Sequence, residues 1–387
     1  MKNIALVFAL VGLVALPGTA SAQGIGGMLG KAKKTADKSA DAKEKAEGLK
    51  ISEKDERRIG EKISAALIDR FGVYQDKEVT KYVSLVGNVL AQASTRPNLQ
   101  WEFIVLDTDG VNAYAAPGGL VHITRGALGL IKNEAELAGV LGHEITHVTA
   151  KHTIKTIETQ NRNDLLAEAG KSKTGEIGDA VIGGLSDMGY KLILEGRFSR
   201  SDEMESDKVG TTLASKVGYA PSGMAAVLQK ISDRNKNQAE PNGWFASHPE
   251  IKDRISAMQK QIKDDKLNGT ALVAARYTKA ITFDVKPAAE IATIAGGAKG
   301  LAGDGGTAKK DDKAAKPEEK PAEPAKKSGG LGKFLSKGSQ AQNEGTVASA
   351  GTRGGVPDRD AVGGSNKSKV RITLTPAEID TFKKGIA

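Results

Sequence analysis

The sequence predicts a mainly α-helical fold with a small β region, followed by a disordered tail. Between residues 51 and 265, long stretches carry apolar side chains at helical spacing. One short stretch, residues 101–123, alternates apolar and polar side chains around turn residues, which is typical of strands. From about residue 288 onward Gly, Ala, Lys, Glu and Pro dominate, and such a composition buries too little apolar surface to fold.

Helices and strands are expected in a definite order. Ser52 and Asp76 are typical N-terminal caps, each followed by an apolar periodic run. Periodicity and turn residues then predict a strand at 101–105, extended pieces at 112–115 and 120–123, a helix from Asn133 to about Thr156, a mobile connection or lid at 160–186, and further helices over 190–217, 222–235 and from Pro249 onward.

The first 22 residues have the features of a secretory signal peptide. Lys2 supplies the charge, residues 4–16 the apolar run, and Ala20 to Ala22 a small-residue cleavage site. The run is too short for an ordinary membrane span, and no later stretch comes close. We therefore expect a soluble protein exported to the periplasm. Because the chain has 0 cysteines, disulfides, thiolate metal ligands and a lipid-modified cysteine are excluded.

The charged residues are interpreted mainly as solvation of the protein surface. The formal net charge is +9, and aromatic residues make up only 4%. The lysines alternate with acidic residues, and no basic cluster contains the aromatic side chains of a nucleic-acid platform. We expect no nucleic-acid partner, whereas the basic tail is compatible with peripheral contact to a membrane or the cell wall. The sequence leaves the oligomeric state open.

Residues 143–147 form an H-E-x-x-H motif inside an apolar helical run. Side chains four residues apart lie on one face of a helix, so His143 and His147 are expected to bind one zinc ion. Glu144 is placed beside that ion, where it is expected to take a proton from the attacking water. The motif therefore predicts a catalytic zinc site that binds one zinc ion per chain.

A catalytic zinc needs a third protein ligand and an open position for water. The metzincin pattern fails, because Ala150 and Thr153 stand where Gly and His are required. His152 points away from His147 around the helix and is interpreted as a structural histidine or as one that supports a metal ligand without binding the metal itself. Glu203 is the favoured ligand, because Asp207 lies one turn later on the same face and would accept the N–H of a ligating histidine.

Four motifs in order resemble the zinc metallopeptidase family of the CAAX prenyl endopeptidases, the HtpX membrane proteases and the BepA-type periplasmic proteases. The matching pieces are Asn112 to Gly119, His143 to His147, Phe198 to Asp207, and Ser247 to Pro249 with Arg254. The resemblance covers about residues 50–265. It implies a gluzincin fold in which His143, His147 and Glu203 bind zinc, Glu144 is the base and Asp207 supports a ligand.

Two further residues receive roles through this resemblance. His248 matches a family position near the metal, either as a resting fourth ligand or as an oxyanion stabiliser; a loop histidine that caps the next helix is the alternative. Arg254 is expected either to hydrogen-bond nearby carboxylates or to polarise the substrate carbonyl, with a surface arginine as the alternative. We favour the resting-ligand role for His248.

The strand region is the expected substrate platform. Asn112, Ala113, Tyr114 and Ala115 are predicted to form an edge strand that pairs with an extended peptide; an ordinary core-flanking strand is the alternative. His122 alternates with apolar neighbours and is predicted to lie on the surface.

The sequence therefore predicts a signal peptide at 1–22, a flexible polar leader at 23–50, a zinc metallopeptidase domain at 51–286, a disordered linker at 287–369 and a strand–helix segment at 370–387. The expected function is cleavage of unfolded or misassembled envelope proteins. The family's multi-spanning members act on prenylated proteins, and this chain lacks their membrane helices, so that substrate class is not expected. A periplasmic chaperone with a latent, His-blocked zinc site, and a scaffold anchored by the tail, are the alternatives.

Overall fold

The computed structural model describes residues 51–160, 177–195, 198–236, 248, 251–287, 293–294, 347–348 and 367–386. The chain divides into two compact units, Met1–Lys50 and Ile51–Ala387, and all described residues belong to the second. The expected signal peptide, polar leader and most of the 287–369 linker therefore lie outside the described residues.

Two amphipathic helices open the described chain. Helix α2 spans Glu53–Phe71 and α3 spans Lys77–Ala93. The side chain of Ser52 accepts a hydrogen bond from the amide of Asp55, and Asp76 caps α3 in the same way, as the sequence predicts. Each helix buries its apolar stripe against the sheet and the helices behind it.

A three-stranded sheet follows, built from β1 (Glu102–Leu106), β2 (Ala113–Ala116) and β3 (Leu120–Thr124). The strand order is β1-β3-β2, with β1 parallel and β2 antiparallel to the central β3. Strand β2 thus lies at a sheet edge, as predicted. A separate two-stranded pair joins β4 (Thr293–Ile294) to β5 (Val347–Ala348) in antiparallel register.

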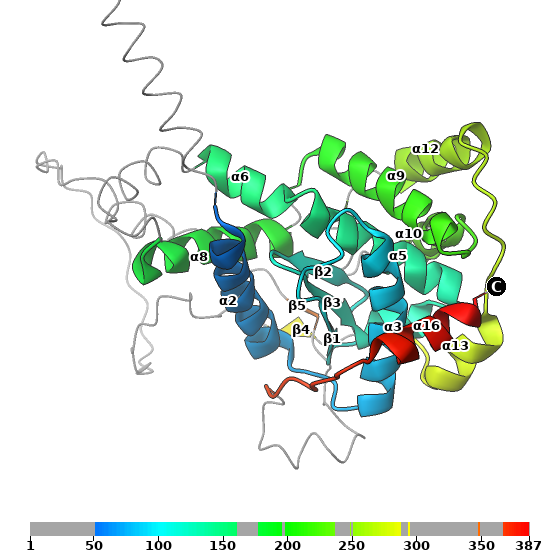
Figure 1. The fold of residues 1–387 in the computed structure, drawn as a ribbon, viewed down its shortest axis with the longest axis horizontal. Helices are drawn as coiled ribbons and strands as arrows, with labels where there is room; N and C mark the ends of the chain where they lie inside the picture. Colours follow the sequence, from blue (N-terminus) through cyan, green and yellow to red (C-terminus); the bar gives the residue numbers. More distant parts are fainter. Residues whose placement is uncertain are drawn as a thin grey trace, which may run out of the picture. The chain divides into compact units, whose positions relative to one another are not determined.

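Helices make up most of the rest and are arranged around the sheet as Figure 1 shows. They are α4 (Arg125–Leu130), α5 (Glu134–Thr149), α6 (His152–Gln160), α8 (Asp179–Glu195), α9 (Arg200–Lys216), α10 (Gly223–Arg234), α12 (Ile251–Asp264), α13 (Ala274–Ala280) and α16 (Pro376–Lys384). The expected mainly α-helical fold with a small β region is confirmed. Within the described ranges, no helix combines the length and apolarity that a membrane crossing requires.

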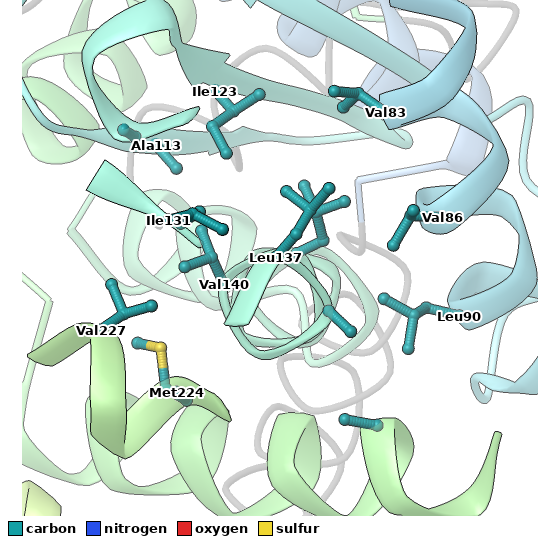
Figure 2. Close-up of a cluster of buried hydrophobic side chains, with 14 of the residues drawn as sticks. Val83, Val86, Leu90, Ala113, Ile123, Ile131, Leu137, Val140, Met224 and Val227 are labelled. Atoms are coloured by element: carbon teal, nitrogen blue, oxygen red, sulfur yellow. The ribbon is translucent and has the colours of Figure 1, made fainter. Parts of the chain in front are cut away.

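Helix α5 is the centre of the hydrophobic core. Almost every residue of it is buried, and it packs against α3, α9, α10 and the sheet. Figure 2 shows α5 side chains between α3 on one side, the sheet on another and α10 on a third. The labelled core residues are Val83, Val86, Leu90, Ala113, Ile123, Ile131, Leu137, Val140, Met224 and Val227. A helix so enclosed is a rigid support for polar side chains.

The predicted helix from Asn133 to Thr156 is wrong in one respect, because it breaks. Helix α5 ends at Thr149, Lys151 adopts a left-handed φ of 59°, and α6 begins at His152. The ammonium group of Lys151 lies 3.0 Å from the buried Glu56 carboxylate, which holds the break in place. Lysine carries no local sequence signal for this conformation, so periodicity alone continues the helix.

The predicted helix over 190–217 is likewise two helices. Helix α8 ends at Glu195, and α9 starts at Arg200 behind a capping box formed by Ser199 and Asp202. Part of the expected 160–186 connection is helical as well, because α8 begins at Asp179. Residues 161–176, where a lid was expected, lie outside the described residues.

The C-terminal segment, residues 367–386, packs onto the same unit. Helix α16 forms with the Thr375–Glu378 capping box and contacts α3. Ile379 and Ile386 are buried, and the guanidinium of Arg276 lies 3.9 Å from the centre of the Phe382 ring. The strand expected over 370–374 is wrong, since these residues pair with no strand in the described chain.

Candidate metal centre

Helices α5 and α9 approach each other most closely at two glycines. A Cβ atom on Gly210 would lie 2.7 Å from the amide nitrogen of His143, and one on Gly142 would lie 3.0 Å from the carbonyl oxygen of Gly210. Only glycine allows this separation. Because His143 follows Gly142 and Asp207 precedes Gly210 by three residues, the close contact brings polar side chains of both helices together. The sequence offers one signal for it, a glycine inside each helical pattern.

His143 and His147 face each other one turn apart on α5. Their Nε2 atoms are 3.1 Å apart, and both rings are buried. Glu203 of α9 lies opposite, with Oε2 3.6 Å from His143 Nε2 and Oε1 3.4 Å from His147 Nε2. The structure therefore brings together the three side chains that the sequence nominates as metal ligands.

His248 joins this cluster from outside both helices. Its Nδ1 lies 2.8 Å from Oε2 of Glu203, and its ring is buried. One ligand atom from each of the four residues His143, His147, Glu203 and His248 lies within 4.8 Å of the others. The neighbours of His248, residues 237–247 and 249–250, lie outside the described chain.

The spacing of these groups fits a zinc ion. A tetrahedral zinc with Zn–N bonds of about 2.05 Å separates two ligand nitrogens by about 3.3 Å, close to the 3.1 Å between the two Nε2 atoms. Imidazole and carboxylate are also the donors that remain for zinc in a chain without cysteine. The residues present therefore match the ligand set expected for this metal.

Asp207 and Arg254 stand behind the cluster. Oδ1 of Asp207 accepts a hydrogen bond from His143 Nδ1 at 2.9 Å, while Arg254 donates to both carboxylate oxygens at 2.7 Å. Burial raises the pKa of Asp207, but the hydrogen bonds from Arg254 and His143 outweigh it, and the net pKa lies below the ordinary value. The carboxylate is therefore ionised and fixes the tautomer of His143 with Nε2 free to bind metal.

Glu203 is ionised for a similar reason. Burial opposes its charge, but His248, His147 and His143 hold its pKa well below the usual range. Arg254 adds a contact of 2.9 Å from Nη1 to Oε2. The expected alternative of a surface arginine is wrong, because Arg254 is fully buried against two carboxylates.

Glu144 lies at the edge of the cluster. It is buried, its Oε1 has no hydrogen-bond partner among the described residues, and His248 Nε2 lies 3.9 Å from that oxygen. Burial, partly offset by His147, raises the pKa of Glu144 to about 8. A buried carboxyl oxygen without a partner among the described residues, 3.9 Å from one of the clustered histidines, has the position of a group that exchanges protons with a water molecule.

The structure places His152 and Phe198 against His147. The Nδ1 atoms of His152 and His147 are 2.9 Å apart, and the Phe198 ring lies 4.4 Å from the His147 ring. Phe198 opens the motif that ends at Asp207, but the sequence did not single it out as a residue that packs against a ligand candidate.

The strand residues are buried, including His122, which was expected on the surface. Asn112, Ala113, Tyr114 and Ala115 are buried, and β2 is covered by α2, α5 and α8. The predicted surface position of His122 is wrong. It is completely buried, with Nε2 2.9 Å from the hydroxyl of Ser64, because both faces of this small sheet are covered by helices.

Comparison with known proteins identifies the segment that contains the cluster. A family model described as Peptidase family M48 matches residues 77–262. The beta-barrel assembly-enhancing protease of Yersinia pestis is 28% identical over 203 residues, which is 51% of this chain and 41% of that protein. The mitochondrial metalloendopeptidase OMA1 of Schizosaccharomyces pombe is 27% identical over 188 residues, 48% of this chain and 53% of that protein.

A third relative is metalloprotease LoiP of Escherichia coli K12, 25% identical over 189 residues, 47% of this chain and 73% of that protein. The chain spans less than half of the length of the beta-barrel assembly-enhancing proteases it matches. All ligand candidates lie inside the matched segment. The segment that contains the ligand candidates therefore resembles peptidase family M48, and the relatives that it matches are named as proteases and metalloendopeptidases.

Proposed function

We propose that this protein is a zinc-dependent endopeptidase of the cell envelope that cleaves unfolded or misassembled exported proteins. The observation that carries the proposal is the convergence of His143, His147 and Glu203 beside the unpartnered Oε1 of Glu144. These are three donors for a metal and one group for proton transfer, the minimum for hydrolysis of a peptide bond by a metallopeptidase.

In this proposal the four side chains have separate tasks. Zinc, when bound by His143, His147 and Glu203, supplies Lewis acidity toward a water molecule and the scissile carbonyl. Glu144 takes the proton of the attacking water and passes it to the leaving amine. Its pKa of about 8 in the metal-free site is near neutral pH, and a neighbouring cation shifts it toward the ionised, basic form.

Asp207 and Arg254 position these groups without touching the substrate. Asp207 holds the His143 ring, and Arg254 forms ion pairs with both Asp207 and Glu203. A site built on two packed helices varies little in geometry, which suits a reaction that needs exact placement of water and carbonyl.

The envelope location and the substrate class rest on other observations. The signal-like first 22 residues support export. The relatives named for β-barrel assembly support an envelope substrate. Strand β2 lies at a sheet edge, which supports binding of an extended peptide along that edge.

Casein cleavage by the purified protein tests the activity. We expect cleavage that a chelator abolishes and added zinc restores, with Glu144→Gln inactive but still zinc-loaded. His147→Ala should lose the zinc itself in elemental analysis. Undiminished zinc in that variant, or full cleavage by Glu144→Gln, would contradict the proposed site.

A chaperone with a latent site is the second candidate, and one contact favours it. His248 lies among the other three ligand candidates, so it is placed to occupy the open position as a fourth ligand. Rescue of an envelope defect by Glu144→Gln in cells would support this function, whereas failure of rescue would support the protease. Proteins that accumulate in the Glu144→Gln strain would identify the substrates.

A further inference from the structure

His147 has a hydrogen-bond partner that differs in kind from that of His143. His143 Nδ1 is paired with the carboxylate of Asp207 at 2.9 Å. His147 Nδ1 instead lies 2.9 Å from Nδ1 of His152, a buried imidazole whose ring plane stands at 80° to that of His147. One of the two facing nitrogens must carry the proton and the other must accept it.

The far side of His152 decides which nitrogen that is. His152 Nε2 lies 3.3 Å from Oε2 of Glu205 and 3.6 Å from Oδ1 of Asp202. Both are partly exposed carboxylates on α9. A carboxylate only accepts hydrogen bonds, so Nε2 of His152 carries the proton. Nδ1 of His152 is then the acceptor, and His147 donates through its Nδ1. This leaves the lone pair on His147 Nε2, the atom that faces His143 and Glu203.

The backbone break at Lys151 produces this contact. On a continuous helix, a residue five positions along points about 140° away. The left-handed Lys151, tied to Glu56, starts α6 in a new direction and returns His152 to the side of His147. The hydroxyl of Ser206, 3.5 Å from His152 Nδ1, packs on the same ring from α9.

We propose that His152 is the positioning residue for His147: it accepts the Nδ1 proton, fixes the ring tautomer and orientation, and so sets the affinity of the site for zinc. This rests on the proposed function, because it assumes that His147 is a ligand. The two histidines of the motif are thus oriented differently, His143 by an aspartate–arginine pair and His147 by an imidazole that reaches a partly exposed glutamate.

Zinc affinity tests the proposal directly. The full-length protein is stripped of metal and titrated with zinc against a competing chelator. We expect His152→Ala to weaken zinc binding by ~10–100-fold, the usual effect of removing a partner that orients a ligand. His152→Asn should recover most of this loss, because the amide oxygen takes the place of Nδ1 as acceptor.

His122 provides the matched control. It is also a buried imidazole, hydrogen-bonded to Ser64 through Nε2, but it lies on β3 outside the cluster. We expect His122→Ala to lower the melting temperature of the metal-free protein at least as much as His152→Ala does, while zinc affinity stays within about twofold of the unaltered protein. An effect on affinity without a matching effect on metal-free stability separates a positioning role from a structural one.

The possible failures are distinguishable. If the unaltered protein binds zinc and His152→Ala binds it equally well, the role of His152 is overturned while the proposed function stands. If the unaltered protein binds no zinc, both are overturned. Should His152→Ala fail to fold, His152→Asn decides: affinity near that of the unaltered protein supports the proposal, and a loss of tenfold or more overturns it.

Discussion

Arg254 and Asp207 form a two-pronged ion pair in the interior of the protein. Nε of Arg254 donates to Oδ2 of Asp207 and Nη2 donates to Oδ1, both at 2.7 Å, and neither side chain is more than 3% exposed. The third nitrogen, Nη1, reaches Glu203 at 2.9 Å. A single guanidinium therefore contacts both carboxylates that face the motif histidines.

Removing this guanidinium should be costly. Arg254→Met leaves two buried carboxylates without a cation, and we expect a loss of about 3–5 kcal/mol of unfolding free energy, measured by urea denaturation of the metal-free protein. Arg254→Met combined with Asp207→Asn should be less unstable than the sum of the single variants, because one stranded charge is gone. Strict additivity would contradict the coupling.

Gly210 should control the spacing of α5 and α9. A methyl group there meets backbone atoms at 2.7–3.0 Å, so Gly210→Ala is expected to force the helices apart, lower stability by about 1–3 kcal/mol and weaken zinc binding. Gly183→Ala in α8 is the control. Apart from its chain neighbours and the backbone of its own helix, no atom of the described residues lies within 4 Å of the added Cβ, so this change should raise helix stability by up to about 1 kcal/mol. Equal effects of the two changes on zinc binding would refute the spacing argument.

His248→Ala separates two roles by the sign of its effect. If His248 is a resting fourth ligand, its loss opens a position for water and raises cleavage of a small unfolded substrate. If it stabilises the oxyanion, turnover falls by ~10²–10³. We expect the increase, because Nδ1 of His248 already lies 2.8 Å from a candidate ligand, Glu203. A large decrease at unchanged zinc content would exclude the resting ligand.

His122 should make the protein sensitive to acid. Burial lowers its pKa from 6.5 to about 3 in the folded state. Between these values the unfolded chain binds the extra proton, so stability is full above pH 6.5 and falls as the pH drops, by up to about 1.4 kcal/mol per unit. His122→Gln, which keeps a partner for Ser64, should flatten this part of the curve. Identical slopes of unfolding free energy against pH in both proteins would show that His122 does not cause the sensitivity to acid.

The C-terminal segment, residues 367–386, should stabilise the helices against which it packs. Deleting residues 367–387 removes the buried Ile379 and Ile386 and the contact of Phe382 with Arg276, and we expect a lower melting temperature. Ile379→Ala alone should cost about 2–4 kcal/mol. Lys81→Ala, which removes only the solvent-exposed ion pair with Glu378, is the control and should leave the melting temperature nearly unchanged. An unchanged melting temperature after the deletion would mean that packing of the segment against α3 does not stabilise the protein.

Much of the fold could be predicted because its signals are local. Ser52, Asp76 and Thr375 cap helices in the structure as their side-chain chemistry predicts, since a cap depends on the next three residues alone. The break at Lys151 gives no such signal. It is held by Glu56, which is distant in sequence, so periodicity missed it and continued the helix to Thr156.

The sequence by itself determined the nature of the site: an H-E-x-x-H spacing on a helix, a glutamate four residues before an aspartate, and no cysteine to offer another ligand set. Those are properties of one helix at a time. Only the tertiary structure decided that His122 is interior, that Arg254 is buried between two carboxylates, and that His152 meets His147. Each of these depends on which helices pack together. Packing is decided by contacts between residues that are distant in sequence, and no local sequence pattern encodes those contacts.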